Sequence, residues 1–238
     1  MSKTTVFNLI ILDESGSMQP NLKSTIDGCN ENLNIIRGLQ EENKDTQRYL
    51  TSIYAFQSGN SSRPARYIRK NEPIDRVSDI TTNEYQPWGG TPLLDAIGST
   101  ISDLMNAAQT HEDAIASITI ITDGEENSSV HYSYADIARL IAQVKEMGWN
   151  INLIGANIDV DALAKSVNID NTMKFQSTAQ GTKVAMDALN ASARQWHHSR
   201  IAMEEDLSAN MDVDSEEFKK ERLKVRKKIG KSFFDVEI

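Results

Sequence analysis

Short apolar runs alternate along the chain with longer segments whose apolar residues recur at helical spacing. The clearest runs, at 6–12, 115–121 and 151–156, are continuous rather than alternating, as expected of strands buried on both faces. Between the strands, apolar residues recur three, four and seven positions apart, so each helical segment presents one face to a sheet. This alternation predicts an α/β fold with a mainly parallel sheet covered by helices.

The remaining segments complete this pattern. An alternating run at 49–56 and a shorter run at 66–68, separated by Gly59 and Asn60, predict a hairpin with an edge strand. The stretch 72–90 has no sustained period and contains two Pro and two Gly, which predicts a surface loop with at most one helical turn. Helices are expected over 22–36, 94–108, 134–144, 160–167 and 181–208, and a last short strand over 173–175.

Composition and charge exclude several classes of function for this chain. The 238 residues are 39% hydrophobic, which is enough for one large domain. The net charge of −9 gives no basic surface for a polyanion, so nucleic acid is not an expected partner. No apolar stretch reaches the ~18 residues that span a bilayer. Residues 1–12 predict a first strand rather than a secretion signal. The single Cys29 excludes an internal disulfide. We therefore expect a cytoplasmic protein without membrane contact.

The end of the chain differs in charge from the rest. Residues 209–238 hold 8 basic and 7 acidic side chains, whereas residues 1–208 hold 17 basic and 27 acidic ones. This difference predicts a domain over 1–208 and a separate charged tail, in which Asp214 can cap an amphipathic helix with Glu217 at its third position. We expect this tail either to dock on its own domain, a neighbouring copy or an acidic partner, or to be solvated and partly disordered. The apolar face of the helix would consist of Phe218, Val225, Ile229 and Phe233.

Oxygen-bearing side chains stand where predicted strands end. Asp13, Ser15 and Ser17 follow the first strand, Thr91 precedes a predicted helix, and Asp123 follows the run at 115–121. Because open α/β sheets bind ligands beyond the carboxyl ends of their strands, we expect these five side chains to lie close together. Donor sets made only of oxygen suit a hard divalent cation. The sequence therefore predicts a metal site at this edge of the sheet.

The segment Asp13-Glu14-Ser15-Gly16-Ser17, followed by Thr91 and by Asp123 in Ile121-Thr122-Asp123-Gly124, resembles the metal-ion-dependent adhesion site of von Willebrand factor type A domains. The resemblance covers roughly residues 5–205. Within that family, the stretches 85–98 and 123–127 are similar to a group of small bacterial and phage single-domain proteins. The resemblance implies a three-layer, Rossmann-like fold whose six-stranded, mostly parallel sheet has one antiparallel edge strand and helices on both faces.

The same resemblance implies the chemistry of the site. Ser15, Ser17 and Thr91 would bind the ion directly, whereas Asp13 and Asp123 would act largely through water. Octahedral oxygen coordination with retained waters favours Mg²⁺, or Mn²⁺, over Ca²⁺. An ion held by neutral hydroxyls keeps charge for one further ligand, which would be an Asp or Glu carboxylate of a protein partner. The resemblance thus implies a non-enzymatic protein–protein interaction module, and it leaves the oligomeric state open.

A Mg²⁺-dependent phosphohydrolase of the haloacid-dehalogenase type is the alternative, because such enzymes also place an Asp after a first buried strand. They need a second Asp two residues later, to protonate the leaving group. Ser15 occupies that position in this chain. The sequence therefore assigns no catalytic residue, and an enzyme is not expected.

Two further expectations concern the surroundings of the site. Glu14, Glu125 and Glu126 are expected to form a solvated acidic rim, and the alternative is that they hold the metal-binding residues in place from behind. Trp88, three residues before Thr91, has two interpretations of equal weight. Its ring either anchors a binding partner or covers the edge of the sheet.

Overall fold

The structure, a computed structural model, describes residues 3–156 and 158–234, so the last four residues of the predicted tail lie outside the described residues. The strands are β1 (Thr4–Asp13), β2 (Gln47–Phe56), β3 (Arg66–Pro73), β4 (Ala114–Thr122), β5 (Asn150–Gly155) and β6 (Asn171–Lys174). The helices are α1 (Leu22–Glu42), α2 (Leu93–Ala108), α3 (Tyr134–Glu146), α4 (Val160–Val167), α5 (Ala179–Asn210) and α6 (Glu216–Ile229). Two short 3₁₀ helices, η1 (Gly16–Asn21) and η2 (Ile74–Arg76), lie in the connections.

The six strands form one mixed sheet in the order β3-β2-β1-β4-β5-β6. Only β3 runs antiparallel to its neighbour, and the other pairs are parallel. In the middle of the sheet, Ile10 of β1 lies between Ile53 of β2 and Thr119 of β4. β1 is buried over nearly its whole length, which explains its continuous apolar sequence. The predicted α/β class, mostly parallel sheet and antiparallel edge strand are confirmed.

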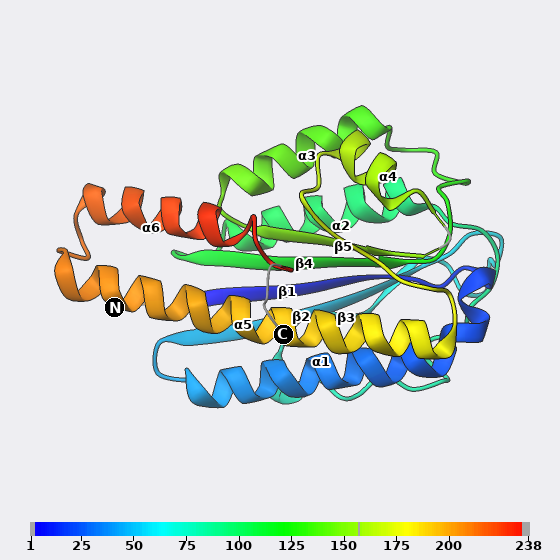
Figure 1. Cartoon of the computed structure of the whole chain (residues 1–238), viewed down its shortest axis with the longest axis horizontal. Coiled ribbons are helices and arrows are strands. Elements are labelled where there is room, and N and C mark those ends of the chain that lie inside the picture. The colour runs from blue at the N-terminus through cyan, green and yellow to red at the C-terminus, as the bar shows by residue number, and fades with distance from the viewer. Residues whose placement is uncertain (1–2, 157, 235–238) are drawn as a thin grey trace.

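Helices cover both faces of the sheet, as Figure 1 shows. α1 and α5 pack together on one face, and α2, α3 and α4 lie on the other. α3 begins where its amphipathic pattern begins, because Ser133 and Asp136 form a reciprocal capping box. It ends before Gly148, whose positive φ of 75° suits glycine. Among the described residues, no helix combines the length and the apolar character needed to cross a membrane.

The edge strand and its flanking loop depart from the prediction in one respect. β3 continues to Pro73, well beyond the predicted 66–68, and it pairs with β2 through Thr51 and Glu72. An edge strand receives its backbone hydrogen bonds from a single neighbour and stays half-buried, so it needs no clear apolar pattern. The single helical turn expected in the following loop is η2.

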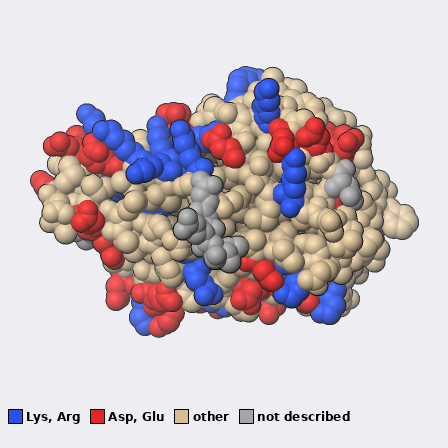
Figure 2. All heavy atoms as spheres, in the orientation of Figure 1, with Lys and Arg blue, Asp and Glu red and all other residues tan. Residues whose placement is uncertain are grey.

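The described part of the tail contains α6, which runs back along α5 (Figure 1). Its N-cap is Ser215, not the predicted Asp214: the Ser215 hydroxyl accepts from the Phe218 N–H at 3.1 Å. Asp214 instead belongs to a turn in which its N–H donates to the Asp212 side chain. Lys and Arg side chains gather over α6, as seen in Figure 2, and Phe218 of the same helix is buried.

Candidate metal site

Asp13 is the last residue of β1 and is fully buried. One carboxylate oxygen accepts from the Ser15 N–H at 2.7 Å, and the other accepts from the Thr122 hydroxyl at 2.5 Å. Burial raises the pKa of Asp13 to about 6 although these hydrogen bonds favour the ionised form, and the nearby Asp123 charge raises it further. The carboxylate is therefore fixed between β1 and β4 by neutral donors alone.

Three hydroxyls from two loops surround one small volume beside Gly124, which lies on a third loop. The Ser15 and Ser17 Oγ atoms lie 3.0 Å apart, and Ser17 donates to an Asp123 carboxylate oxygen at 2.6 Å. A Cβ at Gly124 would lie 2.8 Å from the Thr91 Oγ1 and about 3.5 Å from both serine hydroxyls. The missing side chain of Gly124 thus keeps open the space on which these donors converge.

The loop that carries Thr91 is held in place by its own glycines and by Asn127. Gly89 has a φ of 71°, and a Cβ there would lie 1.7 Å from the Ser58 carbonyl oxygen, so only glycine fits. The Gly16 N–H donates to the Gly89 carbonyl at 3.0 Å. On the other side, the Thr91 N–H donates to Asn127 Oδ1 at 2.8 Å. These contacts join the three loops to one another.

Two residues that the sequence analysis did not single out bind Asp123. The Ser177 hydroxyl donates to its second carboxylate oxygen at 2.9 Å, and Asn21 Nδ2 donates to the same oxygen at 3.2 Å. Ser177 follows β6, so its position at the carboxyl edge of the sheet was a signal available in the sequence. Asn21, at the end of η1, carried no such signal.

The expected acidic rim is wrong for two of its three members. The Glu14 side chain is fully buried against Arg66, and only Glu125 is exposed as expected. The Glu126 carboxylate accepts from the Leu94 N–H at 2.9 Å and from the loop residues that follow it. The free N–H groups at the start of α2 explain this position, since a helix N-terminus attracts a carboxylate. Trp88 is 63% exposed, so its ring does not cover the sheet edge.

The five predicted residues are therefore brought together, and their donors fit a hard divalent ion. The set contains three neutral hydroxyls and two carboxylates, the oxygen donors that Mg²⁺ and Mn²⁺ accept. Within residues 3–156 and 158–234, no Lys or Arg pairs with Asp13 or Asp123, so their charge is left without a cation. The same described residues contain no cluster of three or more His, Cys, Asp or Glu, so any ion here depends on the hydroxyls.

Comparison with known proteins supports the fold. No protein-family profile matches the sequence, and no curated protein matches it. Among solved structures, the PilB minor pilin from Streptococcus sanguinis has a TM-score of 0.52 at 14% identity, over 82% of this chain and 62% of the pilin. A von Willebrand factor type A structure from Catenulispora acidiphila has a TM-score of 0.50 at 16% identity, over 81% of this chain and 43% of the other.

The pilus adhesin SpaC from Lactobacillus rhamnosus GG has a TM-score of 0.57 at 11% identity, over 82% of this chain and 30% of the adhesin. This chain thus spans less than two thirds of each of these proteins. At such identities the likeness concerns the fold and not the ligands. The sheet order, the helices on both faces and these structural matches together show that the chain has the von Willebrand factor type A fold.

Proposed function

We propose that this protein is a non-enzymatic, metal-dependent interaction module that binds a carboxylate of a protein partner. Mg²⁺, or Mn²⁺, would be held by the hydroxyls of Ser15, Ser17 and Thr91, with Asp13 and Asp123 acting largely through water. The observation that carries this proposal is the convergence of the three hydroxyls on the space beside Gly124. Hydroxyls from two separate loops, Ser15 and Ser17 on one and Thr91 on the other, thus face the same space.

The charges around this space explain why a metal would control binding. Among the described residues, the donors to Asp13 and Asp123 are all neutral, and Glu125 is exposed nearby, so the metal-free edge would repel an incoming carboxylate. When bound, the ion would supply positive charge and an open coordination position at this edge. Asp13 and Asp123 would then balance the ion while the neutral hydroxyls leave part of its charge for the partner.

The neighbouring loops support a binding role as well. Trp88 stands exposed on the loop that leads to Thr91, and backbone hydrogen bonds of Trp88 and Gly89 hold that loop against the β1 loop. Exposed aromatic side chains on rigid loops are common anchors in protein interfaces. The phosphohydrolase alternative would need an acid two residues after Asp13, and Ser15 occupies that position.

The proposal is tested by titrating the chelator-treated protein with MgCl₂ and MnCl₂ in a calorimeter. We expect one ion per chain, and the absence of binding by either ion would contradict the proposed site. Turnover of p-nitrophenyl phosphate with Mg²⁺ is measured in parallel. Hydrolysis that Asp13→Asn abolishes would replace the binding role with the phosphohydrolase.

The partner's carboxylate is tested separately. A pull-down with and without chelator identifies proteins whose capture needs the metal, and each acidic residue of a captured protein is then changed to its amide. Loss of binding at one Asp or Glu is the expected result. Capture that persists in chelator, or that no single acidic residue affects, would contradict the proposed mode of recognition.

A further inference from the structure

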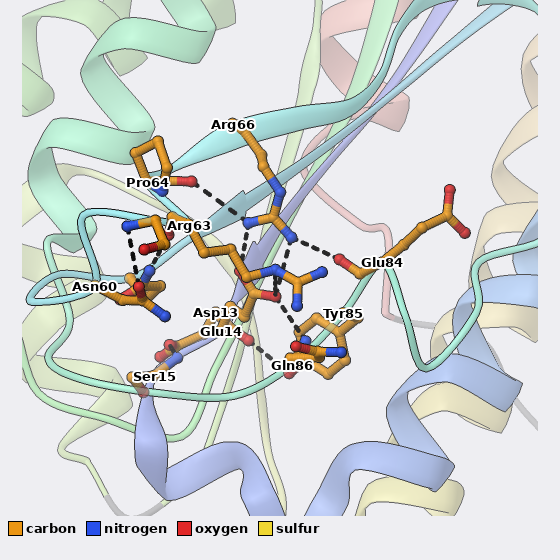
Figure 3. A network of polar contacts seen from close by, with 12 residues as sticks. Asp13, Glu14, Ser15, Asn60, Arg63, Pro64, Arg66, Glu84, Tyr85 and Gln86 are labelled. Atoms are coloured by element: carbon orange, nitrogen blue, oxygen red, sulfur yellow. Dashed lines mark hydrogen bonds and ion pairs between the residues drawn. The ribbon is translucent and has the colours of Figure 1, made fainter.

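Glu14 lies between two residues of the candidate metal site, yet its own buried side chain points away from that site towards the half-buried Arg66. Its carboxylate is fully buried and accepts from both terminal nitrogens of Arg66, at 2.6 and 3.1 Å (Figure 3). Such bidentate arginine–carboxylate pairs fix the orientation of the two side chains as well as the distance between them. Arg63 Nε lies 3.7 Å from the same carboxylate and adds a second positive charge.

The same residue also joins the β1 loop to the segment that leads to Thr91. The Glu14 carboxylate accepts from the Gln86 N–H at 2.6 Å, and the Glu14 carbonyl accepts from the Trp88 N–H at 2.8 Å. One residue earlier, the Asp13 carbonyl accepts from the buried Tyr85 hydroxyl at 2.6 Å. Because Ser15 follows Glu14 directly, these bonds set where the serine hydroxyls stand relative to the Thr91 loop.

We infer that Glu14, held by Arg66, is a positioning residue that fixes the spacing of the metal-site hydroxyls and thereby makes the site prefer Mg²⁺ to Ca²⁺. This inference rests on the proposed function, since it assumes a divalent ion between Ser15, Ser17 and Thr91. Glu14 acts through its neighbours and does not itself reach the ion. We call the pair formed by Glu14 and Arg66 the clamp.

The physical reason lies in the different demands of the two ions. Mg²⁺ requires short, nearly octahedral contacts, whereas Ca²⁺ accepts longer distances and a varying number of ligands. Loops held at a fixed separation can match the smaller ion and cannot spread around the larger one. Loops released from the clamp lose the match to Mg²⁺ but still adapt to Ca²⁺. The clamp therefore affects the ratio of the two affinities and not only their size.

Arg66→Met distinguishes positioning from simple electrostatics, because the two predict opposite changes in the affinity for Mg²⁺. Removing a positive charge close to the site, and leaving Glu14 with the more distant Arg63 alone, should raise the affinity for any cation. Loss of positioning should lower the affinity for Mg²⁺ despite that change of charge. Arg69→Met is the matched control, since Arg69 lies on the same strand but pairs with Glu84 at 2.7 Å and has no contact with Glu14.

The experiment measures Mg²⁺ and Ca²⁺ binding calorimetrically for the wild-type protein, Arg66→Met and Arg69→Met. We expect Arg66→Met to weaken Mg²⁺ binding about 10- to 100-fold, the usual cost of removing a residue that orients metal ligands. Ca²⁺ binding should change by less than about 3-fold, as should both affinities in Arg69→Met. An unchanged or increased Mg²⁺ affinity in Arg66→Met, or an equal loss for both ions, would overturn the inference.

A second variant guards against simple misfolding, because Arg66→Met alone leaves a buried carboxylate without its main partner. Glu14→Gln combined with Arg66→Met removes both charges, so no buried charge remains unpaired. We expect this double variant to unfold at a urea concentration close to that of the wild type and still to lack the preference for Mg²⁺. A wild-type preference in this folded variant would show that the clamp does not set the spacing.

Hydrogen exchange in the metal-free proteins tests the clamp without any ion. The amides of Ser15 and Trp88 should exchange at least about 10-fold faster in the double variant, since local opening removes their protection. Unchanged exchange at both amides would overturn the inference even if metal affinities change. A wild-type protein that binds neither ion would overturn the proposed function together with the selectivity, and faster exchange would then show only that the clamp orders the loops.

Discussion

Two aspartates at opposite ends of the sheet have opposite surroundings. Asp13, at the carboxyl end of β1, is fully buried, its described donors are neutral, and burial raises its pKa to about 6. Asp113, just before β4, is half-buried, and hydrogen bonds and charge from Arg226, with Arg222, lower its pKa to about 2. Burial raises the pKa of both carboxyl groups, and the arginines around Asp113 outweigh that effect.

The comparison shows how a carboxylate's partners indicate its role. Around Asp113, two arginines neutralise the charge internally, and Arg226 also binds Glu204 of α5, so the cluster fastens α6 to the body. Around Asp13, no cation among the described residues balances the charge, which is the condition under which an external ion binds well. The contacts at the amino ends of the parallel strands, the amino edge, therefore stabilise the fold. The side chains at the carboxyl ends, the carboxyl edge, are suited to binding a ligand.

The largest expected effect is at the carboxyl edge. Ser15→Ala combined with Asp123→Ala should abolish measurable Mg²⁺ binding, a loss of at least about 100-fold, because a hydroxyl and one of the two balancing charges are removed. The fold should persist, since neither side chain belongs to the hydrophobic core that holds the helices on the sheet. Calorimetry measures the Mg²⁺ binding, and circular dichroism checks that the fold persists.

Glu125→Gln is the matched control for that double variant, because it removes an exposed charge from the same loop as Asp123. Its Mg²⁺ affinity should stay within about 3-fold of the wild-type value, since exposed charges interact weakly across water. Full Mg²⁺ affinity in the double variant would refute the assignment of the site.

The next largest effect is at the amino edge. Arg226→Met leaves the half-buried Asp113 and Glu204 without their main partner, which should lower the free energy of unfolding by about 3 kcal/mol, the lower end of the cost of breaking a buried pair. Urea denaturation measures this loss, while Mg²⁺ affinity should not change. Lys224→Met, which removes an exposed pair with Glu221, should cost less than about 0.5 kcal/mol. Equal stability of the two variants would contradict the contrast between buried and exposed pairs.

The pH dependence gives a smaller effect with a defined sign. The pKa of Asp113 is lower in the folded protein, about 2, than its ordinary value of 3.8, so its contribution is complete above pH 3.8. That contribution, on the order of 2 kcal/mol, should be lost as the pH falls from 3.8 towards 2. The measurement is the difference in unfolding free energy between the wild type and Asp113→Asn at pH 6, 4 and 2.5. A difference that does not shrink with acidification would rule out this role for Asp113.

The smallest effect concerns Trp88. Trp88→Ala should change the free energy of unfolding by less than about 0.5 kcal/mol, because the ring is 63% exposed and the backbone contacts survive. Mg²⁺ affinity should be equal to that of the wild type, whereas capture of a protein partner should weaken. Chemical denaturation, calorimetry and pull-down test these outcomes, and a large loss of stability would mean that the ring packs on the sheet edge after all.

Local pattern was sufficient to predict most of the fold. Continuous apolar runs identified the central strands, and apolar residues at helical spacing identified the five helices of the body. Both patterns are local, because burial on one or both faces of an element determines which of its neighbouring residues are apolar. The five candidate site residues were also accessible from sequence, since each stands at the end of a predicted element. Their meeting at one edge follows from the parallel order of the strands.

The burial and the partners of the charged side chains were decided by the tertiary structure alone. Glu14 was predicted to be solvated, but Arg66, 52 residues away, buries and pairs it. Asp113, just before the apolar run at 115–121, has no sequence feature that indicates its partner, and only the folding of α6 onto the body brings Arg226 to it. The reason is physical: hydrophobic periodicity is a local property of the chain, whereas the partner of a buried charge is chosen by contacts between distant segments.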